Sequence, residues 1–86
     1  MRVAVDISLY PLTEEFIPPI KDVIERLQSR PSVEVFTNAM STQLRGEYDE
    51  VMDVLNREIR TTFEQCPKAV FAIKILNNPL DETVDE

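Results

Sequence analysis

The side chains best suited to contact a small molecule gather near the middle of the chain. Residues 37–49 read TNAMSTQLRGEYD and include the only glycine of the sequence. Amide and hydroxyl groups of this kind can orient a ligand within an apolar pocket. No reaction centre is evident, because histidine is absent and the single cysteine, Cys66, stands alone before Pro67. The pattern favours binding over catalysis.

Charge and composition narrow the classes of partner. The 86 residues carry 9 Lys and Arg against 16 Asp and Glu, so the formal net charge is −7, and 43% of the residues are hydrophobic. This composition is typical of one small globular domain. The negative charge disfavours nucleic acid and anionic membranes as partners but is compatible with a cationic ligand. We expect a cytoplasmic protein with no metal, no cofactor and no intrachain disulfide.

Alternating hydrophobicity predicts the elements that must position these groups, beginning with four strands. Residues 2–10 alternate between apolar and polar side chains and form the first strand. Residues 33–40 and 41–45 form the second and third strands, joined by a tight turn at 38–41, where asparagine can replace glycine. Residues 69–76 are almost continuously apolar, which predicts a fourth strand covered on both faces.

Two helices complete the pattern. Apolar residues recur at helical spacing after Thr13, and the prolines at 18 and 19 place the start of the first helix near Pro18 and its end near Arg30. The second helix is expected to begin with Asp49 as its N-cap and to end before Pro67. Its apolar stripe comprises Val51, Met52, Leu55, Ile59, Phe63 and Cys66.

The order βαββαβ predicts an α+β, ferredoxin-like sandwich: a four-stranded antiparallel sheet with both helices on one face. Residues 1–77 would form this ligand-binding domain. Residues 78–86 would form an acidic, loosely ordered tail.

Strand parity predicts what the other, open face of the sheet presents. With Lys74 turned away from the helices, this face carries several apolar side chains, which is typical of an interface. We therefore expect a homodimer or homotetramer that pairs sheet against sheet. Asp6 and Lys74 share this face, either as a mutually neutralised pair within the interface or as ligand contacts.

The candidate ligand-binding residues combine polar groups with apolar walls. Parity turns Thr42 towards the core, so a bulge would be needed to bring it to the open face. The full set is Asp6, Ser8, Tyr10, Phe36, Asn38, Met40, Ser41, Thr42 and Lys74.

Three segments of the sequence resemble the YkoF-related family, which is similar to the single-domain thiamine-binding proteins of the ferredoxin-like superfamily. They are DISLYPL at 6–12, the polar segment at 37–49, and FAIKI at 71–75. The resemblance covers residues 2 to about 77. It implies non-catalytic binding of thiamine or its hydroxymethylpyrimidine moiety in vitamin salvage or transport. An acidic protein suits the cationic thiazolium, and Asp, Ser and Asn side chains suit the aminopyrimidine edge.

Two other functions stay open. In the first, the chain is a regulatory or interaction module whose open sheet face serves only oligomerisation. In the second, it is a small enzyme in which a carboxylate and Lys74 act as acid and base, a possibility that only ferredoxin-like relatives suggest.

Overall fold

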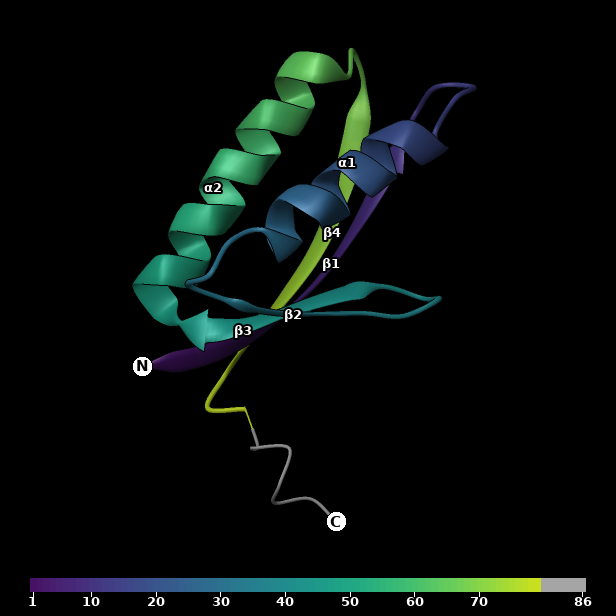
Figure 1. Ribbon diagram of the computed structural model, residues 1–86. Helices are drawn as coiled ribbons and strands as arrows, with labels where there is room; N and C mark the ends of the chain where they lie inside the picture. Colours follow the sequence, from purple (N-terminus) through teal and green to yellow (C-terminus); the bar gives the residue numbers. More distant parts are fainter. Residues whose placement is uncertain (80–86) are drawn as a thin grey trace.

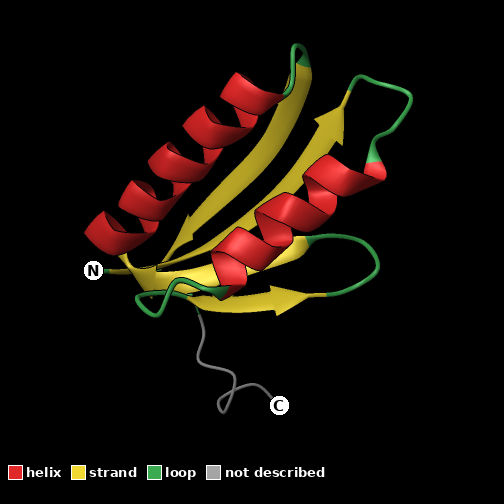
Figure 2. Cartoon of the chain, turned by 45° about the horizontal axis from the view of Figure 1, so that its top comes forward, coloured by secondary structure: helices red, strands yellow, loops and turns green. Residues whose placement is uncertain are grey.

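The computed structural model describes residues 1–79 and shows one sheet with two helices on one of its faces (Figure 1, Figure 2). The elements in chain order are β1 (Arg2–Pro11), α1 (Ile17–Gln28), β2 (Glu34–Thr37), β3 (Thr42–Glu47), α2 (Tyr48–Gln65) and β4 (Ala69–Asn77). The strands are antiparallel in the order β2-β3-β1-β4. The predicted ferredoxin-like fold is confirmed. Most of the predicted tail, residues 80–86, lies outside the described residues.

Strand β1 occupies the middle of the sheet, because β3 pairs with it on one side and β4 on the other. The alternation seen in the sequence is the alternation of its two faces: Val3, Val5 and Ile7 are buried beneath the helices. The core that they join is formed by Val23, Leu27, Val33, Leu44, Val51, Val54 and Leu55. Within residues 1–79, no helix is long and apolar enough to cross a membrane.

Helix α1 begins where the sequence predicted. Pro18 and Pro19 lie in its first turn, where backbone N–H groups have no partner within the helix, so proline is tolerated there. The chain bends between Pro11 and Ile17 to reach this start.

Helix α2 follows β3 with no loop between them. Glu47 is both the last residue of β3 and the N-cap of α2, and its carboxylate accepts a hydrogen bond of 2.9 Å from the backbone N–H of Asp49. The prediction of Asp49 as N-cap was wrong, because β3 runs two residues beyond its predicted end at Arg45. Asp49 lies instead in the first turn of the helix.

The only glycine serves close packing at this junction. Gly46 has no positive φ, so the backbone does not require glycine there. A Cβ atom at this position would lie 3.2 Å from Cγ2 of Val51 and 3.4 Å from the carbonyl oxygen of Ser32. The missing side chain therefore lets the start of α2 approach β3.

Strand β4 corrects another prediction, since it is not covered on both faces. It is an edge strand, and Val70, Ile75 and Leu76 are 48%, 49% and 58% exposed. The side chains of Phe71 and Ile73 pack only partly against the core. An apolar run that looked central in the sequence is thus open to solvent along much of its length.

A buried charged cluster joins the two helices. The side chain of Glu58 in α2 is 0% exposed and accepts hydrogen bonds from Arg26 of α1 (2.5 Å) and from Arg30, which follows the end of α1 (2.9 Å). Arg26 also donates to the hydroxyl of Thr62 at 3.2 Å. These four residues, the Glu58 cluster, satisfy a buried carboxylate with charged donors and hold the C-terminal half of α1 against α2.

Candidate functional site

The polar segment singled out in the sequence forms the tip of the β2–β3 hairpin. The side-chain oxygen of Asn38 accepts hydrogen bonds from the backbone N–H groups of Met40 (2.7 Å) and Ser41 (3.0 Å). The backbone N–H of Asn38 donates to the carbonyl of Ser41 at 3.1 Å. The predicted turn is present, but Asn38 closes it through its side-chain oxygen and does not replace glycine at positive φ, since its own φ is not positive. Because its oxygen is used in the turn, Asn38 has its NH2 group to offer a ligand.

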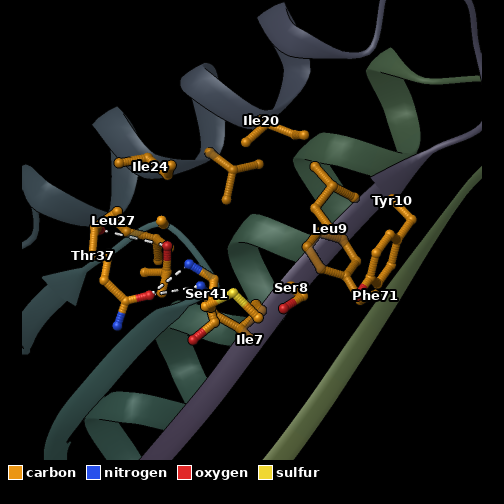
Figure 3. A pocket seen from close by; sticks show the side chains of 15 residues that line it. Ile7, Ser8, Leu9, Tyr10, Ile20, Ile24, Leu27, Thr37, Ser41 and Phe71 are labelled. Carbon is orange, nitrogen blue, oxygen red and sulfur yellow. Dashed lines mark hydrogen bonds between the residues drawn. The ribbon is translucent and has the colours of Figure 1, made fainter.

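A pocket of about 220 Å³ lies between α1 and the sheet, beside the tip of this hairpin (Figure 3). We call it the α1 pocket. Its apolar walls come from Ile20, Ile24 and Leu27 of α1, from Ile7 and Leu9 of β1, and from Phe71 of β4. Residues 37–42 close one end. Apolar walls with a few polar groups at one end are typical of small-molecule sites.

The polar groups of the α1 pocket are mainly hydroxyls. The Oγ1 atoms of Thr37 and Thr42 lie 3.5 Å apart, and Thr42 is buried. Ser8, Tyr10 and Ser41 are also among the residues that border the pocket. Thr42 faces the core, as parity predicted, and it reaches the pocket without a bulge because the pocket lies on the helix side of the sheet.

The nine predicted site residues do not line one pocket. Six line the α1 pocket: Ser8, Tyr10, Asn38, Met40, Ser41 and Thr42. Asp6 and Lys74 instead line a second depression of about 260 Å³, together with Gln43, Arg45 and Leu76. Phe36 lines neither, and the guanidinium carbon of Arg45 lies 5.9 Å from the centre of its ring. The structure thus divides the single open-face site that was predicted, and ligand contact by these residues stays a prediction.

Sequence reasoning missed the apolar half of the α1 pocket. Ile20 and Ile24 belong to the apolar spacing that predicted the first helix, yet both are only half-buried. Phe71, which faces away from the side of the sheet that carries Lys74, is also only half-buried. The apolar stripe of α1 contains more side chains than the core can cover. Such an excess could have indicated a cavity beside this helix.

The chemistry available in the α1 pocket is hydrogen bonding and apolar contact. Among the described residues that line it, none carries a carboxylate, an amine or a guanidinium, and Tyr10 is the one titratable side chain. General acid–base catalysis relies on such groups, most often histidine or a carboxylate. Residues 1–79 also contain no group of three or more His, Cys, Asp or Glu side chains placed to hold a metal ion.

Comparisons with known proteins place the chain in a family. The profile of the family described as thiamine-binding protein matches residues 5–85. No curated protein sequence matches the chain significantly. The chain belongs to the thiamine-binding protein family.

Solved structures confirm the fold. A Thermotoga maritima protein assigned provisionally to thiamine biosynthesis or salvage is similar with a TM-score of 0.84 at 22% identity, over 98% of this chain and 96% of that one. A hypothetical protein from Methanocaldococcus jannascii gives 0.78 at 26% identity, over 94% and 84%. A Bacillus cereus DUF77 domain of unknown function gives 0.76 at 27% identity, over 92% and 78%.

Proposed function

We propose that this member of the thiamine-binding protein family binds thiamine or its hydroxymethylpyrimidine moiety without chemical change, in cytoplasmic salvage or transport of the vitamin. The observation that carries the proposal is the α1 pocket, where apolar walls meet a hydroxyl-rich end. Family membership supplies the ligand class. The absence of carboxylates and amines from the described lining favours binding over turnover.

The size of the pocket favours the pyrimidine ring. At about 220 Å³ it is smaller than the roughly 300–1,000 Å³ of pockets that enclose drug-sized ligands. One substituted ring suits this volume better than the two linked rings of thiamine. In this proposal the pyrimidine ring binds between α1 and the sheet, and the thiazolium ring lies at the solvent-exposed opening of the α1 pocket.

The groups at the mouth suit the second ring. Tyr10 and Met40 line the pocket but are 55% and 87% exposed. A cation over an aromatic ring gains about 0.5–2 kcal/mol, depending on how far it is desolvated. The ring of Tyr10 can therefore stabilise the thiazolium of thiamine, in a protein whose net charge of −7 attracts cations.

The aminopyrimidine edge presents both donors and acceptors. Ser8, Ser41 and Thr42 have hydroxyls that can do either, and Asn38 offers its NH2 group. Asp6, Phe36 and Lys74 lie outside the α1 pocket, so in this proposal they act on the open face, where a homo-oligomer forms.

Isothermal titration calorimetry with thiamine and with hydroxymethylpyrimidine tests the proposal. Both should bind with affinities within about tenfold of each other, because the pyrimidine supplies most of the contacts. Thr42→Val should weaken both about tenfold, the equivalent of one lost hydrogen bond. Thr61→Val, on α2 and outside the pocket lining, is the matched control and should change neither affinity. The absence of heat from either ligand at millimolar concentration would contradict the proposal.

A further inference from the structure

The cations of the chain lie away from the α1 pocket. The sequence has nine Lys and Arg residues, all within residues 1–79. Four of them form ion pairs with carboxylates of the chain: Arg26 and Arg30 with Glu58, Arg2 with Glu34, and Arg57 with Asp53. Arg45 and Lys74 line the second depression, on the open face of the sheet. Lys21, Arg60 and Lys68 are exposed, and none of the nine lines the α1 pocket.

The start of α1 is also a poor site for phosphate. Free backbone N–H groups at a helix N-terminus commonly hold the oxygens of a phosphate. The first turn of α1 borders the pocket through Ile20, but Pro18 and Pro19 in the same turn have no N–H to donate. The segment before the helix adds the exposed carboxylates of Glu14 and Glu15. A phosphate beside this turn therefore meets negative charge and few donors.

Each of the proposed ligands can exist as a free alcohol or as the phosphate monoester of that alcohol. In hydroxymethylpyrimidine, the hydroxyl is on the methylene carbon that joins the pyrimidine to the thiazolium in thiamine. With the pyrimidine between α1 and the sheet, this carbon points to the opening of the α1 pocket, where Tyr10 and Met40 are 55% and 87% exposed. Phosphorylation places a charge of about −1.5 to −2 there, beside a phenol and a thioether that cannot neutralise it.

We propose that the α1 pocket selects the free alcohol and excludes its phosphate monoester. This inference rests on the proposed function, since it concerns the same site. Removing an anion from water without a charged partner is costly, and the net charge of −7 repels it at longer range. The protein therefore handles its ligand before the class of reaction that consumes such an alcohol. That reaction transfers a phosphoryl group from a nucleoside triphosphate to the hydroxyl oxygen and releases the diphosphate and the hydroxyl proton.

The exclusion should weaken with distance from the pyrimidine. In thiamine monophosphate the ester is on the side chain of the thiazolium, one ring further into the solvent. Water solvates the phosphate there, and salt screens its repulsion by the acidic protein. Phosphorylation is therefore expected to cost more affinity in hydroxymethylpyrimidine than in thiamine.

Isothermal titration calorimetry with each alcohol and its monoester tests the proposal. Phosphorylation should raise the dissociation constant of hydroxymethylpyrimidine at least about tenfold and that of thiamine by less. If both alcohols bind and hydroxymethylpyrimidine phosphate binds as tightly as its alcohol, the selectivity is overturned while the proposed function stands. A larger loss for thiamine than for hydroxymethylpyrimidine would also overturn it. If neither alcohol binds, the proposed function fails and the selectivity fails with it.

A cation introduced at the opening provides the converse test. The quantity measured is the dissociation constant of hydroxymethylpyrimidine phosphate divided by that of its alcohol. Met40→Lys should lower this ratio at least about fivefold, because the new ammonium group can pair with the phosphate. Asn56→Lys makes the same charge change on the exposed surface of α2, outside the pocket lining, and should leave the ratio unchanged. An unchanged ratio in Met40→Lys, or an equal decrease in Asn56→Lys, would overturn the proposal.

Discussion

Two carboxylates with buried oxygen atoms differ in whether the chain provides hydrogen-bond donors for them. Glu58, between the helices, accepts hydrogen bonds from Arg26 of α1 and from Arg30, just after α1. Asp6, on the open face, keeps a buried oxygen without a donor in residues 1–79, although Lys74 is its neighbour on β4. The carboxylate between the helices thus has its donors within the chain, whereas the buried oxygen of Asp6 has none within the described residues.

The largest loss of stability is expected when the buried carboxylate of Glu58 is replaced. Glu58→Gln keeps the shape of the side chain but leaves two guanidinium groups without their anion. It should lower the free energy of unfolding by about 3–5 kcal/mol, as when one partner of a buried ion pair is removed. Urea denaturation measures this loss, which is large against the roughly 5–15 kcal/mol that typical domains possess.

A surface pair provides the matched control for Glu58. The exposed ion pair between Arg57 and Asp53 spans 3.1 Å on the same helix. Asp53→Asn should cost less than about 1 kcal/mol, because solvent screens exposed pairs. Equal losses in the two variants would show that burial does not distinguish the Glu58 cluster.

An intermediate effect is expected at the hairpin tip, where the side-chain oxygen of Asn38 accepts two hydrogen bonds within the turn. Asn38→Ala removes the acceptor for the N–H groups of Met40 and Ser41 and should cost about 1–2 kcal/mol. Hydrogen exchange of these two amides should accelerate about tenfold or more. Ser41→Ala keeps both hydrogen bonds and should leave the exchange rates unchanged; a similar acceleration there would contradict the role of the Asn38 oxygen.

The smallest effect on stability is expected at the exposed carboxylate of Glu47, which accepts hydrogen bonds from the backbone N–H of Asp49 and from the N-terminal amine. The backbone N–H of Asp49 lowers the pKa of Glu47 from its ordinary 4.5, and the N-terminal amine adds to this. A lowered pKa in the folded state means that the ionised form stabilises the protein. That contribution is present above pH ~4.5 and is lost as the pH falls through the folded-state pKa.

Unfolding of the wild type and of Glu47→Gln, compared across pH, measures this contribution. The wild type should be the more stable protein at neutral pH, and the difference should shrink below pH ~4.5. A difference that stays constant with pH would show that the charge of Glu47 plays no part.

The fold could be predicted because the spacing of apolar residues along the chain distinguishes strands from helices. The alternation of β1, the prolines that open α1 and the order of the elements were all readable in the sequence. The exposure of β4 was not, because periodicity reports which faces are apolar and says nothing of whether a strand lies at the centre or at the edge. Glu58 was missed for a related reason, since a charged residue on a helix is assigned to solvent by default. Its spacing from Leu55 and Thr62 places it on the buried face.

The α1 pocket includes the hairpin tip that was singled out in the sequence, but strand parity could not show that the tip borders the helix side of the sheet. Parity assigns side chains within a ladder, and the β2–β3 ladder ends at Thr37 and Thr42. Residues 38–41 lie beyond that last pair, so alternation does not determine where they point. The α1 pocket also depends on how far α1 stands from the sheet, which is a property of packing between elements and not of any one segment.

The direct passage from β3 into α2 limits which parts of the molecule can move. Because Glu47 is both the last residue of β3 and the N-cap of α2, no flexible loop separates the strand from the helix. Helix α1 has connecting segments on both sides, and the Glu58 cluster anchors only its C-terminal half. The first turns of α1, which border the α1 pocket through Ile20, are therefore the part of this helix that the cluster does not anchor.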